Sequence, residues 1–206
     1  MHLISLSLEN FRSFGQATLV SFDQAFHCFV GPNGCGKSNL LEACLWGLGM
    51  VDGSPEELLF RGTKSRELAV HLNVGLVVAL DSGEKVSIER LLKSGRTEQL
   101  VNGVPATEAR EFLDYLHSMV RVVSDPAEIR QGVNDGWSSL VVIGDEIDQE
   151  FGDSSTAEFA ADLNTLKQRN QVILASHSRT IMNEADGMTG VTCQEYGLSS
   201  LIGMRL

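Results

Sequence analysis

The sequence is poor in cysteine and in basic residues, and each shortage narrows the classes of protein to consider. Four cysteines among 206 residues show no paired spacing, so free thiols are favoured over disulfides or a metal site. We expect Cys28 and Cys44, which stand in apolar stretches, to be buried thiols of a reducing, intracellular protein. With 16 basic against 27 acidic residues and a formal charge of −11, a basic nucleic-acid footprint over the whole surface is excluded, but a local patch is not.

Long apolar stretches are also missing. No run approaches the roughly 18 residues of a membrane span. The N-terminus lacks the basic region followed by an apolar stretch that marks a signal peptide. There is no internal repeat, low-complexity segment or heptad pattern. What remains is an ordinary globular composition, 43% hydrophobic and 21% charged, long enough for one good core and short for two domains.

Residues 31–38, Gly-Pro-Asn-Gly-Cys-Gly-Lys-Ser, match the G-x-x-x-x-G-K-[ST] pattern that cradles the phosphates of ATP or GTP. The glycines permit backbone angles that turn successive N–H groups toward an anion. Lys37 adds a charge that reaches the β- and γ-phosphates, and Ser38 offers a hydroxyl to Mg²⁺. An apolar run at 25–30 predicts a strand before this loop, and helical spacing of apolar residues over 40–48 predicts a helix after it. This context argues against a chance match in a glycine-rich turn.

The rest of the chain alternates strand and helix patterns, which indicates the α/β class. Before the P-loop, 2–9 and 17–22 predict two antiparallel strands. After the P-loop helix we expect strands at 67–80, 84–92, 100–101, 119–123, 140–143, 171–175, 190–195 and 198–206, and helices at 56–60, 106–116, 126–130, 156–168 and 178–185. Residues 81–83 predict a hairpin turn, and 132–137 predict a loop.

Two of these strands end in polar residues that suit the chemistry of a nucleotide site. The strand at 140–143 leads to Asp145 and Glu146. Asp145 would hold Mg²⁺ through water, and Glu146 would polarise the attacking water as general base. A later strand ends at His177, which suits a sensor of the γ-phosphate. Acidic pairs and single histidines after strands are also common surface features, so the P-loop upstream is what favours a function for these three.

Together these elements resemble the ATPase head of SMC and RecF-type proteins, a branch of the ATP-binding-cassette (ABC) superfamily. The resemblance is carried by residues 8–14, 31–39, 41–43, 46–49, 58–62, 101–103, 145–148, 176–177, 182, 185–186, 190–192 and 197–199. It implies a P-loop NTPase fold of ABC-ATPase type, with a mixed central sheet, an N-terminal antiparallel β arm and flanking helices. It also implies a single head over 1–206, with an N-terminal lobe at about 1–123 and a C-terminal lobe at about 138–206.

The resemblance assigns roles to particular residues, with ATP and Mg²⁺ as cofactors. Phosphate binding falls to Asn33, Gly34, Cys35, Gly36, Lys37, Ser38 and Asn39, metal binding to Ser38 and Asp145, and catalysis to Glu146 and His177. Arg12 is a weaker candidate for contact with the nucleotide, and Arg61 for a place near DNA. Heads of this family sandwich two ATP molecules, so a homodimer or heterodimer through the nucleotide face is implied. DNA held by the assembly is implied too, without a membrane. The expected setting is DNA repair, recombination or chromosome maintenance, in the cytoplasm at the nucleoid or in a eukaryotic nucleus.

Several features of the family are missing. The family's signature motif, a serine and two glycines that open a helix before the Asp-Glu strand, is absent, and 132–139 leaves no room for that helix. No coiled coil separates the lobes, and Gln131 is a poor candidate for the Q-loop glutamine. Gly144 replaces a large apolar residue, and Gly152 replaces an aspartate, with Asp153 one step late. We therefore predict a shortened head.

The sequence leaves two main uses open. The first is a Mg²⁺-dependent ATPase whose hydrolysis depends on a dimer or partner that supplies the signature motif. The second is a non-hydrolysing nucleotide-binding or protein-docking module. The intact Lys37, Asp145 and Glu146 favour the first, and the absent signature favours the second. A small-molecule kinase is a third class, but it needs a lid with arginines and an acceptor pocket, which 67–103 does not resemble.

Overall fold

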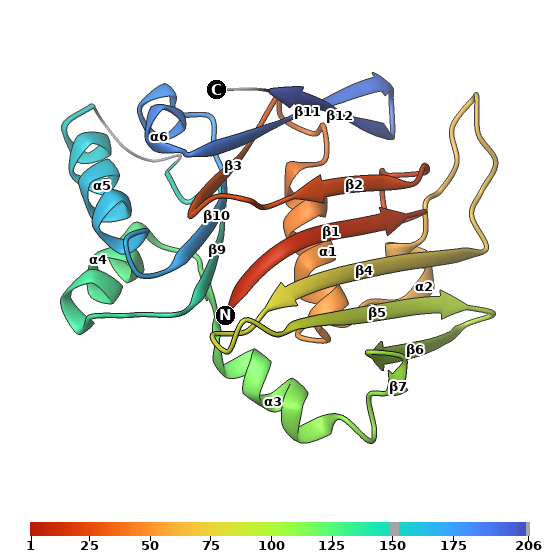
Figure 1. Ribbon diagram of the computed structural model, residues 1–206. Helices are drawn as coiled ribbons and strands as arrows, with labels where there is room; N and C mark the ends of the chain where they lie inside the picture. The colour runs from red at the N-terminus through yellow and green to blue at the C-terminus, as the bar shows by residue number, and fades with distance from the viewer. Residues whose placement is uncertain (149–152, 205–206) are drawn as a thin grey trace.

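The computed structural model describes residues 1–148 and 153–204 (Figure 1). Within these residues the strands form two six-stranded sheets, and helix α1 (Lys37–Leu48) packs between them. This arrangement confirms the predicted α/β architecture with a mixed central sheet and an N-terminal antiparallel arm. The substitution predicted at Gly152 lies outside the described residues.

The first sheet is the antiparallel arm. It contains β1 (His2–Glu9), β2 (Thr18–Ser21), β4 (His71–Ala79), β5 (Lys85–Lys93), β6 (Arg96–Val101) and β7 (Val104–Pro105), in the order β2-β1-β4-β5-β6-β7. The predicted N-terminal pair and the hairpin at 81–83 are confirmed. β6 is longer than the expected 100–101, because it pairs with β5 through polar residues 96–99 that show no apolar alternation.

The second sheet is mixed and carries the candidate site. It contains β3 (Phe26–Val30), β8 (Val120–Val123), β9 (Val141–Asp145), β10 (Gln171–Ala175), β11 (Gly187–Glu195) and β12 (Leu198–Met204), in the order β12-β11-β3-β10-β9-β8. All neighbours are parallel except the edge pair β11–β12. The register sets Ala175 opposite both Phe29 and Asp145. The carboxyl ends of β3, β10 and β9 therefore meet at one edge, which is where ligands bind in open α/β sheets.

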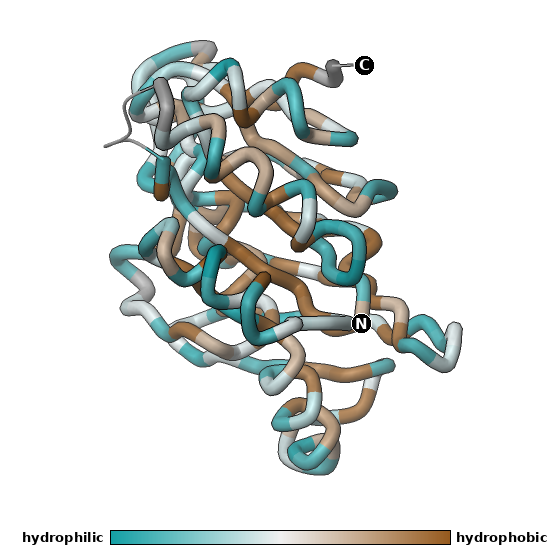
Figure 2. Tube along the Cα trace, turned by 90° about the vertical axis from the view of Figure 1, so that its left-hand side faces the viewer, coloured by the Kyte–Doolittle hydropathy of each residue, from teal (hydrophilic) through white to brown (hydrophobic). Residues whose placement is uncertain are grey.

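The remaining helices of the described residues are α2 (Pro55–Leu58), α3 (Arg110–Ser118), α4 (Pro126–Asp135), α5 (Asp153–Leu166) and α6 (Arg179–Glu184). A second hydrophobic cluster joins α4, α5 and α6 to the face of the second sheet opposite α1. In Figure 2 hydrophobic colour follows the central strands, and hydrophilic colour follows the outer loops. These helices are all too short or too polar to span a membrane.

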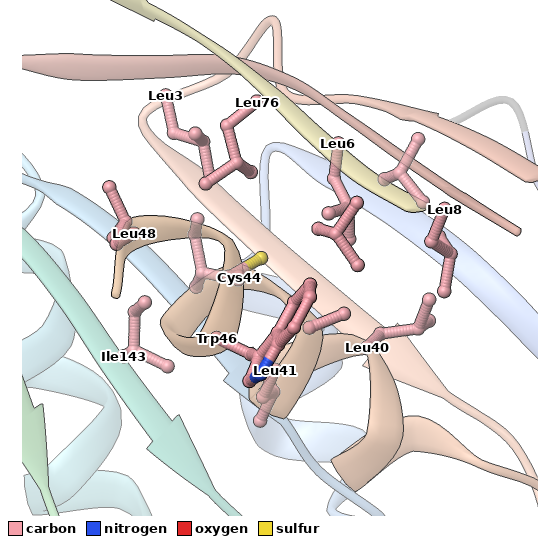
Figure 3. Close-up of a cluster of buried hydrophobic side chains, with 14 of the residues drawn as sticks. Leu3, Leu6, Leu8, Leu40, Leu41, Cys44, Trp46, Leu48, Leu76 and Ile143 are labelled. Atoms are coloured by element: carbon pink, nitrogen blue, oxygen red, sulfur yellow. The ribbon is translucent and has the colours of Figure 1, made fainter. Parts of the chain in front are cut away.

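Helix α1 is buried on both sides, and this holds it rigidly. Figure 3 shows α1 with leucines of the arm, such as Leu6 and Leu76, on one side and Ile143 of the second sheet on another. A helix that packs on two faces is apolar nearly all round, which explains the closely spaced apolar residues of α1. Gly47 lets the arm approach, because a Cβ there would lie 2.9 Å from Val74 Cγ1.

The structure corrects one expectation directly. The sequence predicted a loop at 132–137 and no room for a helix before the Asp-Glu strand, but α4 continues to Asp135 and ends just before β9. The two glycines that suggested a loop have other roles. Gly132 makes space inside the helix for the Trp137 ring, since a Cβ would meet it at 2.6 Å. Gly136, at φ 69°, is the left-handed C-cap.

The cysteines are free thiols in the structure. Cys28 and Cys44 are buried, as expected, and so is Cys35 in the P-loop, while Cys193 is half-buried. Burial raises the pKa of both Cys28 and Cys44 to about 12, so these two thiols stay protonated at neutral pH.

Candidate functional site

The P-loop runs from the end of β3 into α1 with the backbone that its glycines permit. Gly31, Gly34 and Gly36 have φ values of 149°, 75° and 101°. Gly36 is the N-cap of α1, and it offers no side chain to the first turn, which also contains no acidic residue. The start of α1 therefore has neither of the usual internal partners for its amide groups. A helix start in this condition is suited to an anion.

Strands β11 and β12 support the P-loop from behind. A Cβ on Gly31 would lie 2.1 Å from the carbonyl oxygen of Val191, and one on Gly36 would lie 2.5 Å from Ser199 Oγ. Ser199 Oγ also donates to the carbonyl oxygen of Cys35 at 2.7 Å. The loop thus has one conformation that only glycine permits at these two points.

Lys37 lies at the centre of the site and is 2% exposed. Its Nζ donates to the carbonyl oxygens of Gly31, at 3.1 Å, and Pro32, at 3.3 Å. The same Nζ lies 2.9 Å from Glu146 Oε1 and 2.8 Å from His177 Nε2. The structure therefore brings together three of the residues that the sequence singled out, from β3–α1, β9 and β10.

His177 Nε2 has two competing partners. It lies 2.8 Å from Lys37 Nζ and 2.8 Å from Glu146 Oε1. A protonated Nε2 donates to the carboxylate, whereas an unprotonated Nε2 accepts from the ammonium group, so one tautomer cannot serve both. The proton position on His177 thus decides which of the other two residues it holds.

The neighbouring carboxylates have pKa values shifted in opposite directions. Burial raises the pKa of Asp145, and the charge of Glu146 adds to this, while a hydrogen bond from Ser38 and the charge of Lys37 oppose it. Burial also pushes the pKa of Glu146 upward, but hydrogen bonds from Lys37 and His177 outweigh it and leave the pKa below its ordinary value. Glu146 also adopts a left-handed backbone, φ 48°, with its N–H bonded to Ala175 O at 2.9 Å. The site thus contains an ionised Glu146 and an Asp145 that a nearby cation would favour as the carboxylate.

These residues fit Mg²⁺ and a nucleotide. The Ser38 hydroxyl is near enough to the Asp145 carboxylate to oppose the rise in the pKa of that group. A hydroxyl and a carboxylate oxygen therefore lie near one another, and Mg²⁺ takes oxygen ligands of this kind. A metal there would offset the cost of burying Asp145 at the end of β9.

Comparison with known proteins establishes the family. The family model described as the RecF/RecN/SMC N terminal domain matches residues 2–120, more than half of the chain. The chain belongs to this family. The chromosome partition protein Smc of Halobacteriovorax marinus is 30% identical over 125 residues, which are 52% of this chain and 10% of that protein. The Mycobacterium tuberculosis Smc protein is 34% identical over 118 residues, 50% of this chain and 10% of its own length. The chain thus spans about a tenth of these curated relatives.

Solved structures show that the likeness extends over the whole chain. The SMC head domain from Thermotoga maritima has a TM-score of 0.79 and 22% identity, covering 100% of both chains. An Smc head bound to the C-winged helix domain of ScpA has a TM-score of 0.83 and 18% identity, covering 100% of this chain and 98% of that one. The predicted fold, a shortened SMC head of ABC-ATPase type, is confirmed, including the C-terminal part beyond the family match.

In this SMC head the amino end of α4 differs from the amino end of α1, which follows the P-loop. Helix α4, just before β9, begins with amides that its own side chains occupy. The Asp125 carboxylate accepts from the N–H of Ala127 at 2.7 Å, and Glu128 Oε1 accepts from both N and Oγ of Ser124 at 3.0 Å. The two helix starts therefore differ: the first turn of α1 has no side-chain cap, whereas the start of α4 is capped by two carboxylates.

A depression of about 700 Å³ lies beside both the start of α4 and the site. Its lining includes Asp145 and Glu146 of the site, and Ser124, Asp125 and Arg130 at and after the start of α4. Arg130 is engaged across the helices, with α5 residues Asp162 at 2.9 Å and Glu158 at 3.0 Å. The depression therefore joins the carboxylate side of the site to an acidic helix start.

Sequence reasoning assigned no role to two residues that fix the His177 segment. Asp148, 9% exposed, accepts from Ser176 Oγ at 2.5 Å, and Ser176 Oγ in turn accepts from the N–H of Ser178 at 3.0 Å. Both stood in stretches that carried the resemblance. The available signal was their spacing: Asp148 stands three residues after Asp145, and Ser176 stands immediately before His177. A buried carboxylate beside a buried hydroxyl explains how the loop keeps His177 aimed at Lys37.

Other predicted site residues have different partners. Asn39 Nδ2 donates to Ser13 Oγ at 2.6 Å, and Arg12 forms an ion pair with Glu42 of α1. Both therefore connect the β1–β2 turn to α1. Asn33 and Gly34 are exposed at the tip of the loop.

Two further candidates lie away from the P-loop contacts, and one departure from the family pattern has a packing explanation. Arg61 is exposed, with Nε donating to Glu56 O at 3.2 Å. Gln131 bonds Asp135 at 3.2 Å on α4. The glycine at 144 is accounted for by packing, because a Cβ there would lie 2.8 Å from Leu174 Cδ2.

Proposed function

We propose that this chain is an ATP-binding head that works with Mg²⁺ and hydrolyses ATP when a second head completes its site. The observation that carries the proposal is the state of the amino end of α1. The first turn of α1 has no side-chain cap and no acidic residue. Its first residue, the buried Lys37, contacts Glu146, His177 and the P-loop carbonyls. The proposal treats 1–206 as one head, with lobes at about 1–123 and about 138–206. Preference for ATP over GTP rests on the family.

The residues divide the work as follows. The backbone of 33–39 and the start of α1 bind the phosphates, and Lys37 exchanges Glu146 for the β- and γ-phosphates. Ser38 and Asp145 hold Mg²⁺, which supplies charge neutralisation when bound. Glu146, released from Lys37, takes a proton from the attacking water as general base. His177 donates from Nε2 to the γ-phosphate.

The setting follows from the relatives. The matched proteins are chromosome partition proteins, and one matching structure concerns ATP-driven dimerisation and DNA-stimulated activation of SMC ATPases. We propose the same setting for this chain: chromosome maintenance, repair or recombination at the nucleoid, with DNA held by an assembly of heads. A winged-helix partner is also proposed, because a similar head binds that domain of ScpA.

The start of α4 points to an asymmetric pair. In the family a signature motif at this helix reaches the ATP of the opposite head. Here Asp125 and Glu128 occupy the amides, and both would repel phosphate. We propose that the chain binds ATP at its own P-loop but does not complete the site of its partner. The partner therefore is a different head with an intact signature motif.

A non-hydrolysing docking module is the second candidate, and the same α4 start favours it. ATP binding by the purified chain tests the nucleotide site that the first candidate requires, and turnover in the complementation experiment below separates the two candidates. Lys37→Ala and Glu146→Gln serve as controls. Binding that is lost in Lys37→Ala supports the nucleotide site. No binding by the unaltered chain would reject it.

A complementation experiment tests the asymmetric pair. The substitutions Asp125→Gly, Pro126→Gly and Glu128→Gln together remove both carboxylates from the start of α4, and Lys37→Ala in the same chain removes its own nucleotide site. Mixing this quadruple variant with the unaltered chain pairs the nucleotide site of the unaltered chain with the freed α4 of the variant. We expect turnover in the mixture and none in either component alone. Turnover by the unaltered chain alone that rises with its concentration would show that α4 already serves, and would overturn the asymmetry.

A further inference from the structure

The carboxyl-terminal end of α1 is held by side chains from three other elements. The last carbonyl groups of a helix have no partner within it. In α1, the carbonyl oxygens of Trp46, Gly47 and Leu48 each lie at hydrogen-bonding distance from a side-chain nitrogen distant in sequence. The helix supplies no basic residue of its own in its last turn. The negative end of its dipole is therefore balanced entirely from outside the helix.

Arg90 of β5 provides the charge. Its Nη1 donates to Trp46 O at 2.8 Å and to Val51 O at 2.9 Å, and Nη2 lies 2.6 Å from Asp52 Oδ1. The guanidinium also lies over the Trp46 ring, 4.7 Å from its centroid. A planar cation that stacks and donates in a fork fixes both the position and the direction of the helix end.

Gln99 and His117 complete the set from the other side. Gln99 of β6 donates from Nε2 to Gly47 O at 3.1 Å, and His117 Nε2 lies 2.8 Å from Leu48 O. The His117 nitrogen donates here, since a carbonyl oxygen only accepts. His117 is in the last turn of α3, immediately before β8 of the second sheet. The end of α1 is thus tied to the arm and to the crossing between the two sheets.

We propose that Arg90, Gln99 and His117 are positioning residues of the nucleotide site, which act through α1. A helix of this length is stiff, so its two ends move together. The amino end carries Lys37 and Ser38, whose amides and side chains face the phosphates in the proposed function, on which this inference rests. Fixing the carboxyl end of α1 therefore fixes the position and direction of its amino end. Small displacements of the groups that contact a ligand weaken their interaction with it strongly.

Variants that change one donor at a time test the proposal. Gln99→Glu places an acceptor and a negative charge against Gly47 O, and His117→Leu removes a donor. His117→Gln retains an N–H donor. Glu98→Gln, on the exposed neighbour, is the matched control for Gln99→Glu. Each is measured for nucleotide affinity at a temperature at which the chain is fully folded.

A purely structural role is separated by a stability control and a local readout. Ile129→Val lowers stability in the other hydrophobic cluster without contacting α1. Hydrogen exchange of the amides at 37–40 reports whether a change at the carboxyl end of α1 reaches its first turn.

We expect Gln99→Glu and His117→Leu to weaken nucleotide binding on the order of fivefold and to speed exchange at 37–40. His117→Gln and Glu98→Gln should resemble the unaltered chain. If the first two lower stability yet alter affinity and first-turn exchange no more than Ile129→Val does, the positioning role is wrong. If the unaltered chain binds no nucleotide, the proposed function fails and the exchange measurement alone decides the inference.

Discussion

Lys37 Nζ and Glu146 Oε1 lie 2.9 Å apart, so the P-loop lysine forms an ion pair with the residue predicted to be the general base. Both groups are largely shielded from water, with side chains 2% and 21% exposed. Each holds the other away from its proposed task. Phosphate must therefore displace Glu146 from Lys37, and the displaced carboxylate becomes available to water.

Glu146→Gln tests this competition. Removing the charge should strengthen nucleotide binding roughly fivefold, the equivalent of about 1 kcal/mol for a partly exposed pair. The same change should abolish any turnover that a partner permits. Fluorescent nucleotide titration measures the affinity, with Glu84→Gln in the exposed β4–β5 turn as the control acid. An unchanged or weaker affinity would mean that the ion pair does not oppose binding.

Gly36→Ala and Gly34→Ala separate packing from backbone strain. Both glycines have positive φ, so each alanine destabilises the fold by about 1 kcal/mol through its left-handed backbone. A Cβ on Gly34 meets nothing within 4 Å, whereas one on Gly36 lies 2.5 Å from Ser199 Oγ and 2.7 Å from Ser13 Oγ. We expect Gly36→Ala to lower the free energy of unfolding distinctly more, as measured by urea denaturation without nucleotide. Equal losses would mean that the serines move aside freely.

His27 should make the fold sensitive to acid. It is 4% exposed on β3, its Nε2 is 3.0 Å from Thr189 Oγ1, and burial lowers its pKa to about 4 although Asp23 opposes this. The unfolded chain, with a histidine pKa of about 6.5, binds more protons between these values. Stability is therefore complete above about pH 6.5 and falls as the pH drops toward 4, by about 2 kcal/mol between pH 7 and 5.

Urea midpoints at several pH values measure this slope. His27→Gln should flatten it, and His71→Gln, at an exposed position of β4, should leave it unchanged. A slope that survives in His27→Gln would assign the acid sensitivity to another group.

Asp125→Ala tests the filled start of α4. The carboxylate caps the N–H of Ala127 at 2.7 Å, so its loss should lower the free energy of unfolding by about 1 kcal/mol. Nucleotide affinity at the chain's own P-loop should not change, because α1 and α4 begin at separate places. Thermal or urea denaturation measures the first effect, with Asp114→Ala on the exposed face of α3 as the control. Equal losses in the two variants would contradict the capping role.

Local patterns in the sequence were sufficient for most elements and for the components of the candidate site. The P-loop, the alternation of β1 and the buried runs of β3, β9 and β10 each have a periodicity or a glycine spacing that depends on neighbouring residues alone. Parallel order then brings the carboxyl ends of those strands together. For this reason Lys37, Glu146 and His177 lie in contact with one another.

Tertiary structure alone decided what those local patterns left ambiguous. Gly132 continues a helix because the Trp137 ring fills the space beside it, and β6 extends over polar residues because β5 pairs with them. The side-chain partners of Lys37 and the donors at the end of α1 come from residues 44 to 140 positions away in the chain. Such contacts depend on how the two sheets enclose α1, and no sequence window spans them.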